Sequence, residues 1–441
     1  MAETKTAPIL IVGSGAWGLS TALHLTNAGY RNVTVFDRAS EIPSRYSAGY
    51  DLNKIVRAEY EDPFYTDLAL ESIRGWRTPL FGPYYHQTGY VVATSGRAPQ
   101  KAITHLNEAL GSIKEHPVFK PFISSLDKPQ DFLDLFWQFR GPVTGFKGYF
   151  NRYAGYAHSS NAMKGIHHYL AGRGVKFVLG PEQGKVTELL YAQQDTRRTC
   201  TGIKTADGIH HSAQRVICCL GAYQAELLPK IGSFNVAKSW SVAHVQLTEA
   251  ECDLLRGIPV INVRDLGFFF EPDPATRLLK LCPLGAGYIN TDKKTGISLP
   301  PLDALPPPQD YIPAEDEEKL RRLLRETLPW LADRAFVDQK MCWFADTADS
   351  EYCIDFVPDT NNSVIVLSGD SGHGFKMMPV VGSWVVDLLN KGEQRLPRWQ
   401  WRRSDVKTGN DWGDAVSWRI GTQKEIREVI EERERMVKAR L

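Results

Sequence analysis

The apolar positions of the chain fall into short compact runs separated by amphipathic stretches. Residues 9–12 (ILIV) and 33–36 (VTVF) are β-branched apolar runs, and Leu19, Ala22 and Leu23 between them recur with helical spacing. Short apolar β-branched runs are typical of buried parallel strands, whereas the i, i+3, i+4 spacing is typical of a helix. The N-terminal part of the chain therefore predicts a strand–helix–strand unit.

The same patterns predict further elements along the chain, without internal repeats. Helices are expected at 314–331 and 380–389, and a strongly charged helix with a solvated face is expected at 422–441. A proline-rich loop at 297–313 precedes the first of these helices. Strands are expected at 174–180, 184–191, 214–219, 238–247, 267–272, 277–282 and 351–355.

The composition excludes several classes of partner. Of the 441 residues, 43% are apolar and 23% charged, and 52 basic side chains face 51 acidic ones. A nucleic-acid footprint needs clustered excess Lys and Arg, which this balance does not supply. No apolar run approaches the roughly 20 residues that cross a bilayer, and the start of the chain lacks the basic segment of a secretory signal. We expect neither nucleic-acid nor membrane partners.

The cysteines and the C-terminal residues bear on compartment and on metals. An odd number of irregularly spaced cysteines indicates free thiols in a reducing compartment, and no Cys/His spacing fits a zinc site, so no metal is expected. The final Ala439, Arg440 and Leu441 follow the small–basic–leucine pattern of the peroxisomal address. We therefore expect a peroxisomal protein, or otherwise a cytoplasmic one. The seven cysteines are Cys200, Cys218, Cys219, Cys252, Cys282, Cys342 and Cys353.

A glycine motif stands directly after the first predicted strand. Gly13, Gly15 and Gly18 form G-x-G-x-x-G, and Asp37 ends the second strand 19 residues after Gly18. The first glycine permits a tight turn, the second lets the backbone approach a pyrophosphate, and the third lets helix and strand pack closely. Asp37 can accept hydrogen bonds from a ribose 2′-hydroxyl, which argues against NADP. The motif alone leaves NAD and FAD open.

A second segment favours FAD over NAD. Residues 214–222 (QRVICCLGA) read as a strand followed by Gly221, and they resemble the segment that packs beside the glycine loop in FAD enzymes of the glutathione-reductase type. Val186, in the strand expected at 184–191, is the predicted backbone partner of the adenine. Cys218 and Cys219 are then buried strand residues.

Three further stretches, in this order, resemble the amine-oxidising flavoenzymes of the monomeric sarcosine oxidase family. They read AGYDLNKIVRAEY at 48–60, MCWFADTAD at 341–349 and SGDSGHGFKMMP at 368–379. Within that family, the fungal fructosyl-amino-acid oxidases (amadoriases) and the saccharopine and pipecolate oxidases are most similar. The resemblance covers the chain from Ile9 to about Leu389.

The resemblance implies an α/β (α+β) fold with two domains. One is a Rossmann-like FAD-binding domain of the glutathione-reductase type, and the other is a substrate domain built on an antiparallel sheet. Phe268, Phe269 and Phe270 either line the substrate cavity or belong to the core, and alternation sends at least one of them to the opposite face. We place the FAD-binding domain at 1–80, 151–235 and 336–395, the substrate domain at 81–150 and 236–335, and a helical tail at 396–441.

The resemblance also assigns roles to individual residues. It implies a thioether between Cys342 and the 8-methyl carbon of FAD, whereas the residues themselves leave a buried structural thiol as the alternative; Cys353 is expected in the core. Lys280 is expected to promote the reaction with oxygen, because a cation stabilises developing superoxide. Lys54 is expected near the flavin, and Arg57 and Lys376 are expected to hold the substrate carboxylate.

The remaining expected cofactor contacts lie in the glycine loop and in two later turns. Backbone amides around His373 and Gly374 are expected to face the flavin pyrimidine edge. Asp370 is either a cap or a contact to the ribityl chain, and the sequence leaves both open. The other expected contacts are Ala16, Trp17, Arg38, Ser47, Ala48, Gly372 and Phe375.

Two departures from the fructosyl-amino-acid oxidases weaken a sugar-bearing substrate. Those enzymes carry an Asp-Glu pair just after the cysteine that ends the strand of the oxygen lysine, whereas this chain has Pro283 and Leu284 there. They also generally lack an arginine at the position of Arg57. Both differences favour a smaller or differently substituted amino acid held by two cations.

The expected function is an FAD-dependent oxidase of secondary amines of L-amino acids. It would act on CH–NH donors, and its substrate would be a small molecule. Hydride would pass to FAD, the resulting imine would be hydrolysed, and oxygen would be reduced to hydrogen peroxide. No protein nucleophile is needed, because the flavin carries out the chemistry. We expect the protein to be a monomer. Saccharopine, pipecolate or an N-methyl amino acid rank first as substrates, and fructosyl amino acids second. The alternatives are a natural-product amino-acid oxidase, an FAD dehydrogenase with a protein acceptor, and a non-enzymatic FAD-binding module. No side chain stands out as a catalytic base.

Overall fold

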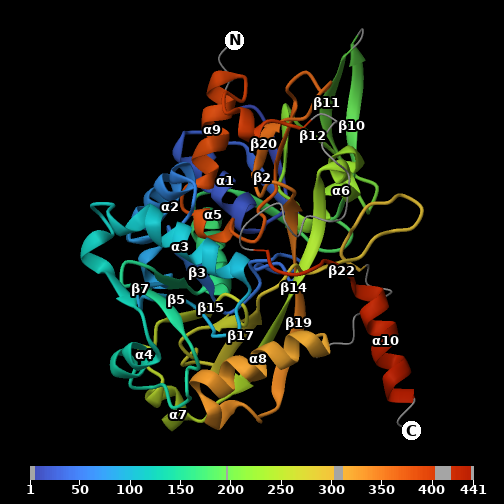
Figure 1. Cartoon of the computed structure of the whole chain (residues 1–441). Helices are drawn as coiled ribbons and strands as arrows, with labels where there is room; N and C mark the ends of the chain where they lie inside the picture. Colours follow the sequence, from blue (N-terminus) through green and yellow to red (C-terminus); the bar gives the residue numbers. More distant parts are fainter. Residues whose placement is uncertain (1–4, 195–196, 302–310, 403–418, 439–441) are drawn as a thin grey trace.

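The computed structural model describes residues 5–194, 197–301, 311–402 and 419–438, and it has a mixed α/β architecture built on two main sheets (Figure 1). The expected targeting tripeptide at 439–441 lies outside the described residues. No helix in the described part of the chain is long and apolar enough to cross a membrane.

The first sheet is mostly parallel and contains both strands of the glycine motif. Its order is β20-β21-β13-β1-β2-β9, and only the edge pair β20–β21 is antiparallel. All four residues of β1 are buried, as expected for a strand covered on both faces. The strands span Ile9–Val12 (β1), Val33–Asp37 (β2), Lys176–Leu179 (β9), Arg215–Cys218 (β13), Cys353–Phe356 (β20) and Val364–Ser368 (β21).

Successive side chains of β1 enter different cores, because they point to opposite faces of the sheet. Ile9 and Ile11 join the core that contains helices α1 (Ala16–Asn27), α5 (Ser159–Gly172) and α9 (Val381–Lys391), and α1 packs against both of the others. Leu10 and Val12 face a separate three-stranded antiparallel sheet. That sheet consists of β10 (Val186–Gln194), β11 (Arg197–Thr205) and β12 (His210–Ser212).

The second main sheet has ten strands and is mostly antiparallel. Its central strand β14 (Asn235–Gln246) carries β19 (Phe336–Thr347) along one edge and both β17 and β18 along the other. The order is β22-β18-β14-β17-β16-β15-β5-β7-β6, with β19 added beside β14. The other strands span Tyr90–Thr94 (β5), Ile123–Leu126 (β6), Lys147–Asn151 (β7), Val260–Val263 (β15), Gly267–Phe269 (β16), Leu278–Pro283 (β17), Tyr288–Ile289 (β18) and Lys424–Glu425 (β22).

Helix α8 covers the second sheet. Its Leu320, Leu323 and Leu324 are fully buried in a core shared with β16 and β17. The helix ends at Thr327, before the 331 that the sequence pattern predicts, because a residue before proline is disfavoured in the helical region and Pro329 follows Leu328. Helix α8 spans Ala314–Thr327.

The remaining elements complete the layers seen in Figure 1. A small antiparallel sheet has the order β3-β8-β4, and its first strand carries Lys54. The charged helix expected near the end of the chain is α10, and it is largely exposed. These elements span Lys54–Val56 (β3), Tyr85–His86 (β4), Gly155–Ala157 (β8), Pro63–Trp76 (α2), Gln100–Lys114 (α3), Pro129–Leu135 (α4), Gln224–Leu227 (α6), Glu249–Leu254 (α7) and Ile426–Lys438 (α10).

One part of the expected domain division differs from the strand pairing. We assigned 336–347 to the FAD-binding segments, but β19 pairs with β14 over almost its whole length, from Phe336 to Thr347. Long-range strand pairing depends on which partner edge is available in space, and no local pattern in β19 specifies it.

Candidate active site

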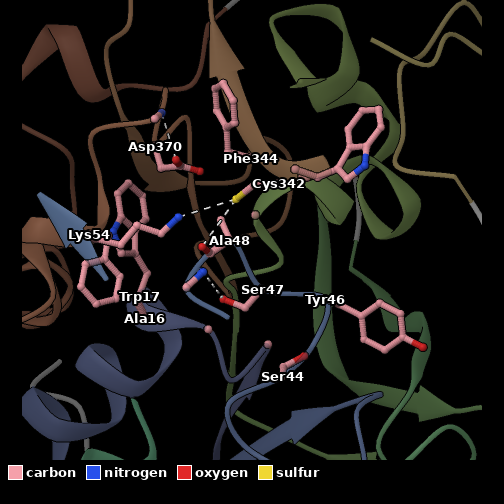
Figure 2. Close-up of a pocket in the computed structure, with 18 of the residues that line it drawn as sticks. Ala16, Trp17, Ser44, Tyr46, Ser47, Ala48, Lys54, Cys342, Phe344 and Asp370 are labelled. Atoms are coloured by element: carbon pink, nitrogen blue, oxygen red, sulfur yellow. Dashed lines mark hydrogen bonds between the residues drawn. The ribbon is translucent and has the colours of Figure 1, made fainter. Parts of the chain in front are cut away.

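A continuous cavity runs from the glycine turn to the second main sheet. At one end it is lined by Gly13, Gly15 and Asp37, and at the other end by residues of β15, β16 and β17. Figure 2 shows the middle of this cavity, where Lys54 and Cys342 point toward each other beside Ala48. The cavity therefore joins the predicted dinucleotide site to the predicted substrate site.

The three glycines of the turn meet different surroundings. A side chain on Gly13, whose φ is +105°, would place its Cβ 2.4 Å from Cys219 O, and one on Gly18 would place it 1.9 Å from Gly13 O. A Cβ on Gly15 would instead meet only the Ser47 side chain, at 3.2 Å. The first and third glycines therefore permit close backbone packing, and the second keeps the cavity open beside the uncapped N-terminus of α1.

Asp37 is tightly held inside this end of the cavity. Its Oδ2 accepts hydrogen bonds from Ser14 N (2.8 Å) and Ser14 Oγ (2.7 Å), and its Oδ1 accepts from Ala39 N (2.9 Å) and Ser44 Oγ (3.0 Å). Because a carboxylate offers about four acceptor sites, a ribose hydroxyl would have to displace one of the two serine hydroxyls. The fixed carboxylate orders the turn that surrounds it.

Arg38 lies between two tyrosine rings at the cavity edge. Its guanidinium carbon is 4.4 Å from the Tyr46 ring centroid and 3.9 Å from that of Tyr223, and its Nη1 is 3.3 Å from Glu226 Oε2. Nη2 is buried without a hydrogen-bond partner in the described part of the chain. An adenine or phosphate group in this place would satisfy that donor.

Cys342 lies in the middle of β19, half-buried at the cavity wall. Its Sγ is 3.7 Å from Lys54 Nζ and 3.7 Å from Ala48 O. These two contacts come from the segment 48–60, nearly 300 positions earlier in the chain, and Figure 2 shows the three side by side. Cys353 and Cys218 are fully buried in strands, as predicted. Cys219 is also buried but lies just after β13, not in the strand as predicted, and all seven cysteines are free thiols.

A buried carboxylate, Asp51, organises the lysines of the site. Its Oδ2 is 2.5 Å from Lys280 Nζ and 2.8 Å from Lys54 Nζ, and its Oδ1 is 3.8 Å from Lys340 Nζ. Burial alone would raise the pKa of Asp51, but the lysines, Lys280 first, hold it well below its usual range. Lys280, which also donates to Asn53 O (2.7 Å), is therefore a fixed cation and only 1% exposed.

The predicted carboxylate clamp, Arg57 and Lys376, lies on the substrate side of the cavity. Lys376 Nζ donates to Tyr60 Oη (2.7 Å) and to His373 O (2.8 Å). Burial, reinforced by the nearby Arg57 charge, lowers the pKa of Lys376 well below its usual range. The Arg57 guanidinium lies over the Tyr60 ring at 4.8 Å, and no described residue forms an ion pair or hydrogen bond with it.

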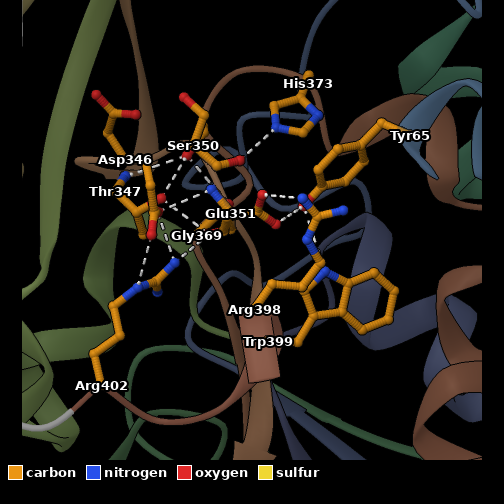
Figure 3. A network of polar contacts seen from close by, with 12 residues as sticks. Tyr65, Asp346, Thr347, Ser350, Glu351, Gly369, His373, Arg398, Trp399 and Arg402 are labelled. Atoms are coloured by element: carbon orange, nitrogen blue, oxygen red, sulfur yellow. Dashed lines mark hydrogen bonds and ion pairs between the residues drawn. The ribbon is translucent and has the colours of Figure 1, made fainter. Parts of the chain in front are cut away.

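His373 connects this clamp to a second polar network (Figure 3). Its Nδ1 lies 3.0 Å from both Tyr60 Oη and Tyr352 Oη and shares its one lone pair between them, while Nε2 donates to Ser350 O at 2.9 Å. Burial lowers the pKa of His373 well below its usual range, so the ring is neutral at pH 7. The ring therefore fixes the Tyr60 hydroxyl, which accepts a hydrogen bond from Lys376 Nζ.

The loop that holds His373 is fastened by arginines from the C-terminal part. Arg398 lies 3.1 Å from Glu351 Oε1, and Tyr65 Oη donates to the other oxygen of Glu351 at 2.6 Å. Arg402 donates to Glu351 O (3.2 Å), and Arg419 donates to Ser350 Oγ (2.9 Å). Figure 3 shows Tyr65, Arg398 and Arg402 converging on Glu351 and its neighbours.

Most of the predicted cofactor contacts line the cavity, with two exceptions. Gly18 and Gly374 lie behind its wall, and Gly374 O accepts from Trp17 Nε1 at 3.0 Å. The His373 amide, which we expected to face the flavin, donates to Asp370 O instead. The predicted residues that line the cavity are Gly13, Gly15, Ala16, Trp17, Asp37, Arg38, Ser47, Ala48, Lys54, Val186, Gly221, Cys342, Asp370, Gly372, His373, Phe375 and Lys376.

Asp370 acts as a cap for two backbone segments. Its Oδ2 accepts from Ala345 N (3.0 Å) and its Oδ1 from Gly372 N (3.1 Å). It also lines the cavity, so the capping role does not exclude a cofactor contact. Burial raises the pKa of Asp370 to about 6.

The three consecutive phenylalanines divide between cavity and core, as alternation predicts. Phe268 and Phe270 line the cavity, whereas Phe269 is fully buried in the core beneath α8. Leu284 also lines the cavity, where the fructosyl-amino-acid oxidases would have an acid. An apolar side chain therefore occupies the wall expected to contact a sugar.

Sequence reasoning missed several residues that the fold brings into the site. Asp51 and Tyr60 stand inside the quoted stretch 48–60 but carry no motif of their own, and only their contacts reveal a role. Arg264, directly after β15, also lines the cavity. Its one sequence signal was its position directly after the short strand VINV, which has three apolar residues and one asparagine. Within the described residues, no group of three or more His, Cys, Asp or Glu could hold a metal ion.

The glycine turn, the uncapped helix N-terminus and the unsatisfied Arg38 donor together fit a dinucleotide. The model of the family described as FAD dependent oxidoreductase matches residues 8–388, and the chain belongs to this family. Its fold and cavity thus define an FAD-dependent oxidoreductase.

Individual relatives and one solved structure show which kinds of enzyme in this family are similar to the chain. L-saccharopine oxidase of Schizosaccharomyces pombe is 32% identical, over 92% of this chain and 95% of that protein. Monomeric sarcosine oxidase of a Bacillus species is 23% identical, over 87% and 92% respectively. Among solved structures, fructosamine oxidase (Amadoriase II) of Aspergillus fumigatus superposes with a TM-score of 0.86 at 34% identity, covering 96% of each chain.

Proposed function

We propose that this protein is an FAD-dependent oxidase of secondary amines derived from L-amino acids, with dioxygen as the electron acceptor. The observation that carries the proposal is the single cavity that joins the glycine turn to Arg57 and Lys376. FAD, when bound, supplies the acceptor for a hydride from the carbon beside the amine and passes its electrons to dioxygen as hydrogen peroxide.

The residues of the clamp support an amino-acid substrate. The Arg57 guanidinium can donate two parallel hydrogen bonds to a carboxylate, and Lys376 can add a third donor. Burial lowers the pKa of Lys376, and a bound carboxylate would raise that pKa again by favouring the charged amine. The bound carboxylate would also fix the orientation of the neighbouring amine.

The cation Lys280 supports dioxygen as the acceptor. Two ion-pairing lysines share Asp51, so the group of Lys280, Lys54 and Asp51 keeps a net positive charge. A fixed, buried positive charge stabilises superoxide as it develops, without reorganisation at the moment of reaction.

We propose that FAD is bonded covalently to Cys342. The sulfur lines the cavity and lies beside the Lys54 ammonium at 3.7 Å, which would stabilise negative charge on it. Formation of the bond between Sγ and the 8-methyl carbon would break one S–H and one C–H bond and release two protons and two electrons, which dioxygen would ultimately accept to give hydrogen peroxide. A peroxisomal location, suggested by residues 439–441, agrees with an enzyme that releases peroxide.

A fructosyl-amino-acid oxidase is the second candidate, because the fructosamine oxidase structure superposes so closely. Leu284 at the cavity wall favours the saccharopine or pipecolate type instead, and so does Arg57, which no described residue binds through an ion pair or hydrogen bond. The similarity to L-saccharopine oxidase over 92% of this chain also favours that type.

Peroxide release from a panel of amines tests the proposal. Purified protein would be incubated in air with N-methyl amino acids, pipecolate, saccharopine and fructosyl amino acids, and again without oxygen. Peroxide from at least one amine in air supports the oxidase. Loss of the yellow absorbance without oxygen, but no peroxide in air, would identify a dehydrogenase. A colourless protein that binds no FAD would refute the proposal.

A further inference from the structure

Arg264 is a buried arginine inside the same cavity that the carboxylate clamp does not use. It follows β15 directly, its backbone N donates to Ala93 O (2.8 Å), and its side chain is only 5% exposed. It lines the cavity together with Arg57 and Lys376. Its Nε and Nη2 are buried and have no hydrogen-bond partner within the described part of the chain.

The acids near Arg264 are engaged elsewhere. Asp265 accepts from Ser95 N (2.9 Å) and Ser95 Oγ (2.5 Å), and Glu61 is bonded to His105. Glu59 accepts from Asn151 Nδ2 at 2.6 Å. The Tyr90 side chain is hydrogen-bonded to the Arg264 guanidinium. Leaving Nε and Nη2 buried without a partner in the described residues is still costly, so these donors are available to an anion.

A second unsatisfied group stands beside it. Asn262 lines the cavity two residues earlier, is 3% exposed, and leaves its Oδ1 without a hydrogen-bond partner in the described residues. The two side chains lie at positions i and i+2, so they share one face at the end of β15. Together they offer donors for a carboxylate and an acceptor for a neighbouring N–H or O–H group.

The cavity continues beyond Arg264. Arg264, Trp240 and Leu284 line this cavity and also a second one beside it. A substituent longer than a methyl group therefore has space next to the guanidinium. A fructosyl group is uncharged and would leave the arginine unpaired.

We propose that Arg264 binds a second carboxylate of the substrate, so that the preferred substrates are secondary amines carrying at least two carboxylates. The first carboxylate would dock on Arg57 and Lys376, and the second on Arg264 with support from Asn262. This inference rests on the proposed amine oxidase and assigns its specificity. N-methyl amino acids and pipecolate with a single carboxylate would be poorer substrates.

Matched substrates that differ in one carboxylate test the assignment. We would measure KM and kcat for N-methyl-L-glutamate against N-methyl-L-glutamine, for N-methyl-L-aspartate against N-methyl-L-asparagine, and for L-saccharopine. The wild type should show a KM about a hundredfold lower for the better acid than for its amide, the loss expected when one partner of a buried charge pair is missing.

Variants at Arg264 should abolish this preference. Arg264→Met should bring the acid and amide KM values within a few-fold of each other, with kcat little changed, and Arg264→Lys should retain part of the difference. Arg322→Met is the matched control, because Arg322 bonds Ser95 Oγ and does not line the cavity. It should keep the wild-type preference. Equal KM values for acid and amide in the wild type, or a preference unchanged in Arg264→Met, would overturn the inference.

Calorimetry separates this inference from the proposed function. Glutarate and its monoamide would be titrated into the yellow protein, and the wild type should bind glutarate at least tenfold more tightly. If no amine yields peroxide or reduces the flavin, the proposed function fails, and this titration alone decides the role of Arg264. Should Arg264→Met not fold, the wild-type and Arg264→Lys titrations decide it, and the absence of a preference for glutarate refutes it.

Discussion

At Asp51, two lysines from different sheets share one buried oxygen. Lys280 reaches it from β17 at 2.5 Å and Lys54 from β3 at 2.8 Å. Without Asp51, the ammonium group of Lys280 would be buried without a counter-ion, which is unfavourable, and its side chain could turn away from the cavity. The shared carboxylate fixes both ammonium groups, and the three side chains together keep a net positive charge. The proposed role in oxygen activation requires this charge.

We predict that Lys280→Met slows reoxidation by oxygen by at least a hundredfold and flavin reduction by less than tenfold. The reason is that removal of the fixed charge affects only the step in which negative charge develops on dioxygen. Stopped-flow absorbance of the two half-reactions measures both rates. Lys340→Met, which removes a lysine 3.8 Å from Asp51 outside the cavity wall, is the control. Equal slowing of both half-reactions in Lys280→Met would contradict the assigned role.

We predict that Cys342→Ser abolishes the proposed covalent bond to FAD, so that the variant releases its cofactor. The serine hydroxyl is smaller and far less nucleophilic than a thiolate, so the tether would not form. Acid precipitation should leave the wild-type pellet yellow and the variant pellet colourless, with free FAD in the supernatant. Cys353→Ser, in the neighbouring sheet core, should retain the yellow pellet. A wild-type pellet without colour would show that the cofactor is not bonded to the chain.

At the scale of elements, strand β1 and helix α1 owe their close approach to two glycines. A Cβ on Gly18 would lie 1.9 Å from Gly13 O, well inside any tolerable contact. The turn between strand and helix, and with it the uncapped helix N-terminus, therefore depends on this contact. The strand, helix and glycines were all predictable, because each follows from a local pattern of residues.

Gly18→Ala should destabilise the protein by about 1–3 kcal/mol and reduce the FAD content, because overpacking against backbone outweighs the helix propensity gained. Gly111 in α3 offers a matched control. A Cβ there meets nothing within 4 Å, so Gly111→Ala should stabilise by about 0.5–1 kcal/mol. Thermal unfolding and the ratio of absorbance at 450 and 280 nm report both effects. An unchanged midpoint for Gly18→Ala would argue against this account of the turn.

Strand β14 brings Lys280 and Cys342 to the same cavity, and no local sequence pattern predicts this. It pairs with β17 at His244–Lys280 and with β19 at Trp240–Cys342, so two residues more than 60 positions apart reach one cavity. The family resemblance assigned both residues roles, but the residues alone only suggested a strand lysine and a free thiol. Their common wall follows from strand order, which is set by long-range pairing.

At the scale of the whole molecule, positive charge is concentrated in the cavity although the chain carries a formal net charge of only +1. Such a basic, partly enclosed cavity focuses the field and attracts anionic ligands, including the FAD pyrophosphate and a substrate carboxylate. The basic residues that line it are Arg38, Lys54, Arg57, Lys185, Arg264, Lys280 and Lys376, and the acidic ones are Asp37, Glu226 and Asp370.

The buried Lys376 should make stability depend on pH. Its pKa is lowered in the folded state, so the unfolded chain binds its proton more tightly, and the free energy of unfolding rises as pH increases from the lowered pKa toward the ordinary value near 10.4. Lys376→Met removes this dependence. Urea unfolding at pH 7, 8, 9 and 10 should show the variant more stable at pH 7, with the difference shrinking at higher pH by at most about 1.4 kcal/mol per pH unit.

Lys120→Met, at an exposed ion pair with Glu115, is the control for this series. A difference between Lys376→Met and wild type that stays constant across the series would show that Lys376 binds its proton equally in both states. Added glutarate should reduce the wild-type dependence if it restores the proton on Lys376.

The sequence by itself determined the strand–helix–strand unit, its glycine turn, the buried cysteines and the helices α8, α9 and α10. These depend on residue spacing within one segment, and spacing is a local property. Comparison of motifs with a known family added the cofactor and the basic residues of the site.

Only the tertiary structure decided which groups meet. Asp51 binds Lys280 across the site, Tyr60 links Lys376 to His373, and Arg264 enters the cavity with two nitrogens that no described residue satisfies. β19 joins the second sheet, against our expectation. The physical reason is common to all four: burial, charge pairing and strand order depend on distances between segments that are remote in the chain, and these distances exist only once both sheets have formed.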